Sequence, residues 1–246
     1  MKIHTGSNIK INTPTAIAIG KFDGLHKGHA ALIKELTVSA RRRNLSSAIL
    51  SFSPHPAALF SNSPEAPLLL TQDEKYTMLE KMGIDDLIEY PFTKDFAELE
   101  PERFVKDVFA KQLCGRLMVV GSDFRFGKDR MGDAAFAKTI GKACNVSVLT
   151  ISPITEESDK ISSNAIRNSI IACDFAKAEK MLGYPYFVSD ICPIGKLMPP
   201  AGAYFCRVYS NKQTFSIIVH VTETGLRPQA NLDSNPLKVE FCIALS

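Results

Sequence analysis

The strongest constraint on this sequence is a series of short apolar runs, each followed by a segment of helical periodicity. The runs do not alternate polar and apolar residues, which is typical of strands buried on both faces of a sheet. The predicted strands are residues 16–19, 48–52, 86–90, 117–120 and 146–151, and the predicted helices are residues 28–42, 71–82, 100–113, 133–144, 162–171 and 175–182. Because strands that alternate with helices form parallel sheets, we predict an α/β fold with a mainly parallel sheet covered on both faces.

Local signals support several of these helices. The first has its apolar residues on one face, namely Leu32, Ile33, Leu36 and Ala40. In the second, Thr71 is expected as the N-cap with Glu74 at the capping-box position. Pro101 occupies the first turn of the third, where its missing N–H costs nothing.

The pattern changes after Tyr184. Residues 203–209, 214–221 and 237–244 read as strands with no helix between them. We therefore predict two domains, residues 1–184 and residues 185–246. The second is small for an independent core, so we expect it to lean on the first domain or on another copy of the chain.

Composition excludes several classes of protein. Of 246 residues 45% are hydrophobic and 22% charged, and the net charge is +3, which is globular and too weakly basic to predict nucleic-acid binding. The basic run Arg41–Arg43 is interpreted as a solvated helix end. No run approaches a membrane span, and the polar N-terminus resembles no signal peptide. The six cysteines form no C-x-x-C pair, so we expect reduced thiols in a cytoplasmic protein.

Three unusual loops follow predicted strands, at Gly20, Ser53 and Gly121. In parallel sheets such loops converge at the carboxyl ends of the strands, where ligands bind. The first opens a helix, whose N-terminus favours anions. His26 and His29 are three residues apart there, on one side of the helix start, and each could donate to phosphate or carry a proton near it. The alternatives are histidines that only fill a helix terminus, or a zinc site, for which further ligands are missing.

The remaining motifs are S-P-H-P at 53–56, G-S-D-F-R-F-G at 121–127 followed by Arg130, and I-S-S-N-A-I-R at 161–167. Ser162 or Ser163 would cap a helix and could donate to phosphate. Arg167 would point toward the same helix end and pair with phosphate oxygens. Phe124 and Phe126 are either core residues or a stacking wall for a flat ring.

Together these motifs resemble the FMN adenylyltransferase module of prokaryotic riboflavin kinase/FAD synthetases, over about Ile17 to Tyr186. The matching motifs are G-x-F-D-G-x-H-x-G-H at 20–29, F-x-P-H-P at 52–56, G-x-D-F-R-F-G at 121–127 and I-S-S-x-x-I-R at 161–167. The resemblance implies a Rossmann-like nucleotidyltransferase domain. It also implies the reaction ATP + FMN → FAD + pyrophosphate, with Mg²⁺ on the phosphates.

The resemblance also assigns site residues. The implied catalytic residues are His26, His29 and Arg167, with the histidines on the ATP phosphates. The implied substrate-binding residues are Gly20, Phe22, Asp23, Gly24, Gly28, His55, Phe60, Asp123, Phe126, Gly127, Arg130, Ser162 and Ser163. Among these, Asp23 would support the loop, Asp123 would contact nucleotide or flavin, and Phe60 and Phe126 would lie near the isoalloxazine ring. Asn164 departs from the threonine usual in the family, and no metal ligands are assigned.

The C-terminal part departs further. Related bifunctional proteins carry a riboflavin kinase barrel there, and only residues 197–204 are similar to it. The phosphate-binding motif of the kinase is missing and the chain is short for a full barrel, so we predict no riboflavin kinase activity. The tail is then a remnant that stabilises the first domain or mediates homo-oligomer formation.

Two further functions remain open on the sequence. One is nucleotidyl transfer to another phosphorylated acceptor, such as a pantetheine, nicotinate or glycerol phosphate. The other is a flavin- or nucleotide-binding protein that has lost catalysis. The aromatic loop favours a flavin, and the intact His26/His29 pair favours an enzyme with ATP and FMN as substrates.

Overall fold

The computed structural model describes residues 1–53, 66–156, 159–189, 195–210, 213–229 and 238–245. The chain divides into two compact units. Unit 1 comprises Met1–Phe22, His29–Ala66 and Thr77–Pro153, and unit 2 comprises Asp23–Gly28, Pro67–Tyr76 and Ile154–Ser246. Two short segments from the first third of the chain therefore pack with its C-terminal part.

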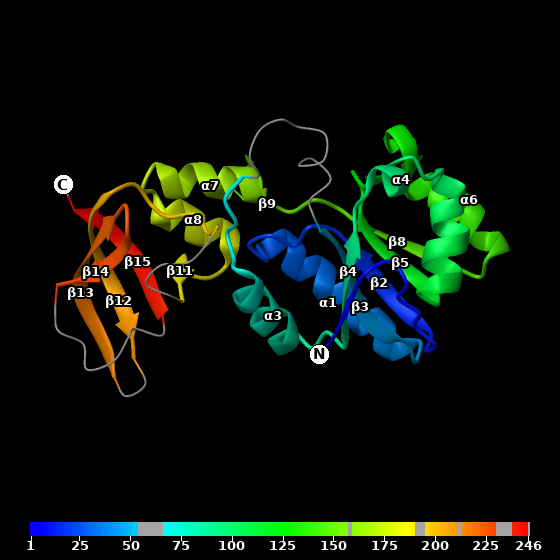
Figure 1. Cartoon of the computed structure of the whole chain (residues 1–246), viewed down its shortest axis with the longest axis horizontal. Coiled ribbons are helices and arrows are strands. Elements are labelled where there is room, and N and C mark those ends of the chain that lie inside the picture. The colour runs from blue at the N-terminus through cyan, green and yellow to red at the C-terminus, as the bar shows by residue number, and fades with distance from the viewer. Residues whose placement is uncertain (54–65, 157–158, 190–194, 211–212, 230–237, 246) are drawn as a thin grey trace. The chain divides into compact units, whose positions relative to one another are not determined.

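Unit 1 is built on a six-stranded sheet in the order β1-β4-β3-β2-β5-β8, in which every pair of neighbours is parallel. The strands are β1 (Lys2–Thr5), β2 (Thr15–Ile19), β3 (Ser46–Ser53), β4 (Asp86–Pro91), β5 (Gly115–Gly121) and β8 (Ser147–Ile151). Helices α1 (Lys27–Arg42) and α6 (Ala134–Ala143) lie on opposite sides of this sheet (Figure 1). All five residues of β2 are buried, as expected for a central strand covered on both faces.

Shorter elements complete unit 1. They are α4 (Lys94–Ala97), α5 (Pro101–Arg103), η1 (Phe104–Gln112), β6 (Arg125–Phe126), η2 (Lys128–Arg130) and β7 (Gly132–Asp133). Helix α3 (Gln72–Lys81) begins in unit 2 and ends in unit 1. The predicted helix after Pro101 is present, but η1 is a π-helix rather than an α-helix. Its buried Phe104, Val108 and Phe109 pack with the sheet residues Ile17 and Met118.

Unit 2 contains a five-stranded antiparallel sheet in the order β11-β15-β12-β13-β14. The strands are β11 (Phe187–Val188), β12 (Gly202–Tyr209), β13 (Thr214–Thr222), β14 (Gly225–Pro228) and β15 (Lys238–Leu245), and the hairpin β9 (Thr155–Glu156) and β10 (Asp159–Lys160) precedes them. Helices α7 (Ser163–Ile171) and α8 (Phe175–Leu182) share one core with the sheet: Ile170 and Phe175 cluster with Val208 and Phe241. The C-terminal strands thus bury their inner face against these two helices.

The structure confirms the predicted fold class, a parallel α/β sheet with a small β-rich C-terminal part. The predicted apolar face of α1 is buried as expected. Sequence reasoning missed β1, β14 and the short hairpins, which are too brief to show a period. The compact units do not follow the predicted division at residue 184, because residues 154–184 pack with the C-terminal strands. The division into functional modules stays a prediction.

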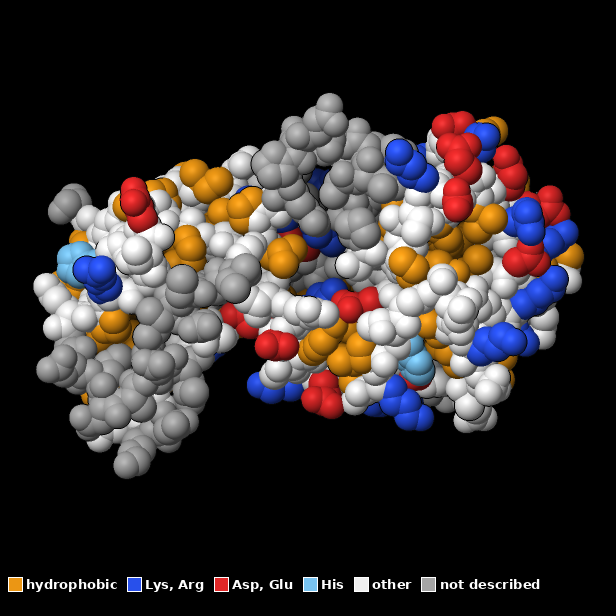
Figure 2. Space-filling model, in the orientation of Figure 1, with side chains coloured by type: hydrophobic (Ala, Val, Ile, Leu, Met, Phe, Trp, Pro, Cys, Tyr) orange, Lys and Arg blue, Asp and Glu red, His pale blue; other side chains and the backbone are white. Residues whose placement is uncertain are grey.

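The surface agrees with the low net charge. On the face that Figure 2 draws, Lys and Arg side chains are interspersed with Asp and Glu along the edge of unit 1. No helix among the described residues is long and apolar enough to cross a membrane.

A buried ion pair in unit 2 anchors the start of α3. Thr71 and Glu74 form the predicted capping box: Thr71 N donates to Glu74 Oε2 at 2.8 Å, and Glu74 N donates to Thr71 Oγ1 at 3.3 Å. The same carboxylate accepts hydrogen bonds from Lys196 Nζ and from Ser189 N. Burial lowers the pKa of Lys196 to about 8, against the opposing attraction of Glu74. One glutamate therefore connects α3 to the segments on both sides of residues 190–194.

Replacing Lys196 by Met should destabilise the protein by about 3 kcal/mol, because it leaves the Glu74 carboxylate buried without its cation. Thermal unfolding of the purified chain measures this loss. The matched control is Lys128→Met, which breaks the exposed pair of Lys128 with Glu98 and should leave the melting temperature nearly unchanged. Equal losses in the two variants would contradict a special contribution from the buried pair.

Candidate functional site

The parallel sheet brings the three unusual loops of unit 1 to one edge. Strands β3, β2 and β5 are neighbours and end at Ser53, Ile19 and Gly121. Strand β2 is followed in the sheet by β3 and β4 on one side and by β5 and β8 on the other. This reversal of strand order is a topological switch point, and ligands of such sheets bind outside the carboxyl ends of the strands there.

The loop after β2 begins in unit 1 with an unusual backbone. Gly20 N donates to Leu50 O at 3.0 Å and so continues the sheet by one residue. Phe22 is buried at a φ of 53°, in the left-handed region that non-glycine residues rarely adopt. Its ring packs against the imidazole of His29, with 5.1 Å between the ring centroids. Such strained positions concentrate where a ligand is bound.

The next residues of the loop, Asp23–Gly28, belong to unit 2. Gly24 has a φ of 80°, and a Cβ there would lie 2.7 Å from Leu69 Cδ1. Gly28 leaves room for the imidazole of His26, because a Cβ at Gly28 would lie 3.2 Å from that ring. A side chain at Gly24 is therefore opposed by both the positive φ and the close approach of Leu69, and at Gly28 by the nearby imidazole alone.

His26 is buried, and burial lowers its pKa from 6.5 to about 4. Its imidazole is therefore neutral at pH 7 in the absence of a ligand. A neutral ring still donates one hydrogen bond to a phosphate oxygen. An anion placed beside it would raise its pKa.

Asp23 forms the centre of a buried polar network in unit 2. Its carboxylate accepts from Leu69 N at 2.9 Å and pairs with Arg167 Nη2. Arg167 is itself buried, and it also donates to Pro67 O at 2.8 Å and to Asn164 Oδ1 at 3.0 Å. The charge of Asp23 is thereby neutralised, so it opposes the approach of a phosphate much less than a bare carboxylate would.

The two serines at the start of α7 make different contacts. Ser162 is the N-cap of α7, and its Oγ accepts from Ala165 N at 3.2 Å. Ser163 Oγ donates to Asp23 O at 2.9 Å. Tyr184, two residues beyond the end of α8, donates from its hydroxyl to Gly24 O at 2.5 Å. The carbonyl groups of Asp23 and Gly24 are thus both bound by the α7–α8 region, and Tyr184 is a contact that sequence reasoning missed.

A second feature of unit 1 is an aromatic cavity of about 130 Å³. Its walls are Ile19, Phe52, Phe92, Phe96, Ala97, Leu99, Phe104, Phe124, Arg125, Phe126, Gly127 and Arg130. Phe126 is buried and stacks on Phe124, with 5.4 Å between centroids and 17° between the ring planes. These two rings pack on the core and also line the cavity, whereas their stacking on a flat ring of a ligand stays a prediction.

Two glycines determine where Phe126 lies. A Cβ on Gly132 would lie 2.8 Å from its ring, and a Cβ on Gly127 would lie 2.6 Å from Pro101. The predicted residues Phe126, Gly127 and Arg130 are thus brought together at this cavity. Sequence reasoning missed Phe92, Phe96 and Phe104, although the density of aromatic residues between Tyr90 and Phe104 is a visible signal.

Asp123 follows β5 in unit 1, and its Oδ1 would be 2.9 Å from a Cβ on Gly121. Its carboxylate therefore lies at the carboxyl end of β5, beside the switch point. The predicted residues His55 and Phe60 are outside the described residues. No group of three or more His, Cys, Asp or Glu that could bind a metal occurs in the part of the chain that the structure describes.

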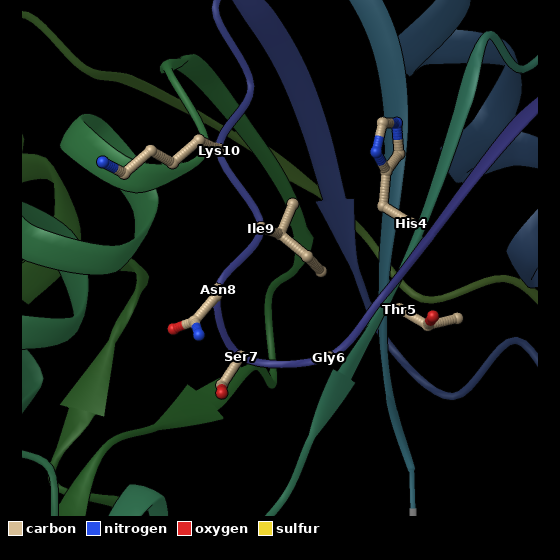
Figure 3. Close-up of a pocket in the computed structure, with 7 residues that line it drawn as sticks. All are labelled: His4, Thr5, Gly6, Ser7, Asn8, Ile9 and Lys10. Atoms are coloured by element: carbon tan, nitrogen blue, oxygen red, sulfur yellow. The ribbon is translucent and has the colours of Figure 1, made fainter.

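Another open hollow of about 400 Å³ is lined by His4–Lys10 (Figure 3). In Figure 3, Lys10 extends away from the sheet, whereas Ile9 is turned toward the strands and is buried. His4 Nε2 is hydrogen bonded to Asp86 Oδ1 at 2.8 Å. None of the residues predicted to bind substrate lines this hollow.

A family model described as FAD synthetase matches residues 8–165, which include the loop, the aromatic cavity and the start of α7. The chain belongs to the FAD synthetase family. This membership confirms the resemblance that the four motifs indicated, and it agrees with the parallel fold.

Individual relatives support the same assignment. The chain is 34% identical over 221 residues to an FAD synthetase of Listeria monocytogenes, which covers 87% of this chain and 86% of the relative. It is 35% identical over 174 residues to a bifunctional riboflavin kinase/FMN adenylyltransferase of Escherichia coli, covering 70% of this chain and 55% of that protein. The chain thus spans about half the length of the bifunctional relatives that it matches.

A solved structure from Streptococcus pneumoniae, described as a macrolide-efflux protein, superposes with a TM-score of 0.82. It is 23% identical and covers 100% of this chain and 91% of its own. At this identity the likeness concerns the fold alone.

The neutral state of His26 has a consequence for stability in acid. Its folded-state pKa of about 4 is below the unfolded value of 6.5, so the unfolded chain takes up the proton first as the pH falls. The contribution of the neutral His26 to the free energy of unfolding is therefore fully present above pH 6.5 and is lost as the pH falls toward 4. Between pH 7 and pH 5 the wild type should lose about 2 kcal/mol more than His26→Asn in urea unfolding. His220→Asn is the matched control, and equal losses in His26→Asn and wild type would contradict the burial of a neutral ring.

Proposed function

We propose that the protein is an FMN adenylyltransferase that forms FAD and pyrophosphate from ATP and FMN. The single observation that carries this proposal is the loop from Gly20 to His29 in a chain of the FAD synthetase family. The loop follows β2 at the switch point of the sheet and opens α1, whose first turn has no acidic residue. A helix N-terminus of this kind provides N–H groups and positive potential for phosphates.

The proposed chemistry requires positioning more than proton transfer. A phosphate monoester has a second pKa of about 6, so the FMN phosphate is largely a dianion at neutral pH and needs no strong base. One of its oxygens forms a bond to the α-phosphorus of ATP, and the bond from that phosphorus to the bridging oxygen breaks to release pyrophosphate. His26 and His29 are proposed to donate hydrogen bonds to the ATP phosphates, where preorganised donors stabilise the developing charge.

Arg167 has a more defined position than the sequence indicated. Since its guanidinium already binds Asp23, Asn164 and Pro67, we propose that it acts on the triphosphate chiefly by bracing the loop. Ser163 would assist through its bond to Asp23 O, and Ser162 through the N-terminus of α7.

The aromatic cavity is the proposed place of the flavin. Its volume of about 130 Å³ is below that of a pocket for a whole drug-sized ligand, roughly 300 Å³ or more. The cavity therefore suits one edge of the isoalloxazine ring, with the apolar dimethylbenzene end the best match to its phenylalanines. Arg130 at its border could then face the polar part of FMN.

Mg²⁺ is proposed to accompany ATP. This ion is usually bound by substrate phosphates together with one or two carboxylates, and Asp123 offers an oxygen ligand of that kind at the end of β5. Bound there, Mg²⁺ would neutralise part of the phosphate charge. Asp23 is less suited, since both of its oxygens accept hydrogen bonds from protein donors.

The decisive assay is incubation with Mg-ATP and FMN followed by chromatography for FAD. His29→Ala should lower the rate of FAD formation by about 10² because it removes one phosphate donor, whereas His220→Ala in β13 is the matched control. Riboflavin in place of FMN should not be phosphorylated, because the kinase motif is missing. An unchanged rate in His29→Ala would contradict the phosphate role, and a wild type that forms no FAD would favour another acceptor or a binding protein.

The flavin proposal has its own test. Phe126→Leu should raise the KM for FMN about fivefold, through loss of ring stacking, and leave the KM for ATP nearly unchanged. The control Phe136→Leu alters a ring that packs against Phe126 at 6.5 Å but does not line the cavity. Steady-state kinetics of both variants decide between a flavin wall and a purely structural ring, for which the two would behave alike.

A further inference from the structure

Asn164 lies within the I-S-S-N-A-I-R motif, at the position where the resemblance implies threonine. It lies in the first turn of α7, next but one after the N-cap Ser162. Although Asn164 itself is exposed, its Oδ1 accepts a hydrogen bond from Nη1 of the buried Arg167 at 3.0 Å. Residues three apart on a helix are neighbours, so this contact follows directly from the helical spacing.

The contact matters because of what surrounds Arg167. Its Nε, Nη1 and Nη2 each donate to an acceptor from a different segment: Pro67 O, Asn164 Oδ1 and the carboxylate of Asp23. A guanidinium is planar and always charged, so acceptors on three of its nitrogens determine both its position and its rotation. Among these acceptors, Asn164 is the one supplied by α7 itself.

The orientation of Arg167 affects the loop after β2, because Arg167 is paired with Asp23 of that loop. One carboxylate oxygen of Asp23 accepts a hydrogen bond from Arg167, and the other accepts one from Leu69 N. The carbonyl oxygen of Asp23 accepts a hydrogen bond from Ser163 Oγ. His26 follows three residues later in the same compact segment, Asp23–Gly28. A rotation of the guanidinium would therefore shift the residue from which the histidine-bearing segment starts.

We propose that Asn164 is a positioning residue for ATP in this protein: its side-chain oxygen holds the Arg167 guanidinium in its ion pair with Asp23 and thereby orients the loop that carries His26. The proposal rests on the proposed function for its kinetic consequence. Threonine has its hydroxyl one bond closer to the helix backbone, so it could not occupy the position of Asn164 Oδ1. With asparagine at this position, a residue of α7 itself holds the guanidinium of Arg167 in place.

The test compares Asn164→Leu, which keeps the shape and removes the acceptor, with Asn164→Asp, which keeps an acceptor. The matched control is Asn168→Leu, the same change at another exposed asparagine one turn along α7. Asn164→Leu should lower kcat/KM for ATP about tenfold through the lost bond to a charged group, with the KM for FMN within about twofold. The kcat/KM for ATP of Asn164→Asp should remain within about threefold of the wild-type value. Asn168→Leu should have the same kcat/KM for ATP as the wild type.

A second measurement does not depend on catalysis. The Nε–H signal of Arg167 in a ¹H–¹⁵N spectrum, assigned by its loss in Arg167→Lys, should shift and exchange faster with water in Asn164→Leu but not in Asn168→Leu. Identical spectra and identical kcat/KM for ATP in the two leucine variants would overturn the proposal. If the wild type forms no FAD, the proposed function fails, while the Arg167 signal and a titration with ATP alone still decide the role of Asn164.

Discussion

The buried ion pair of Asp23 and Arg167 is the interaction on which the geometry of unit 2 depends. Two charges removed from water are costly unless hydrogen bonds satisfy them fully. Here Leu69, Pro67 and Asn164 supply those bonds. The pair therefore joins three segments that are distant in the sequence: the loop after β2, the residues before α3 and helix α7. It also brings Asp23–Gly28, part of the loop between β2 and α1, into the same compact unit as the C-terminal strands.

The second constraint is the parallel pairing of β2 with β3 and β5, which puts the ends of these strands at one edge of the sheet. Phosphate-binding loops belong there, because helix N-termini and strand ends meet at that edge. The loop after β2 has backbone strain at Phe22 and Leu25, both with positive φ. Gly24 and Gly28 add close approaches to the side chains of Leu69 and His26. Fixed placement of donors is what the proposed transfer between two anions requires.

Much of the fold could be predicted because its signals are local. The apolar runs gave the strands, and the face of α1 formed by Leu32, Ile33, Leu36 and Ala40 is buried as the period indicated. Thr71 and Glu74 make the capping box that their spacing predicted. The π-helical hydrogen bonds of Phe104–Gln112 could not be predicted, since the same apolar spacing suits an α-helix. Strand β1 is only four residues long and mostly polar, so its side chains gave no signal, although it pairs with β4 along its whole length.

By itself the sequence determined the fold class, the family and the residue types of the candidate site, because these are written in periodicity and in motifs of fixed spacing. Only the tertiary structure decided how those residues are used. Arg167 turns inward to Asp23 and Asn164, and His26 is neutral because it is buried. Phe126 joins rings from four other segments around one cavity. The hydrogen-bond partners, the burial and the pKa of a side chain depend on groups that are distant along the chain. A local sequence pattern does not contain those groups.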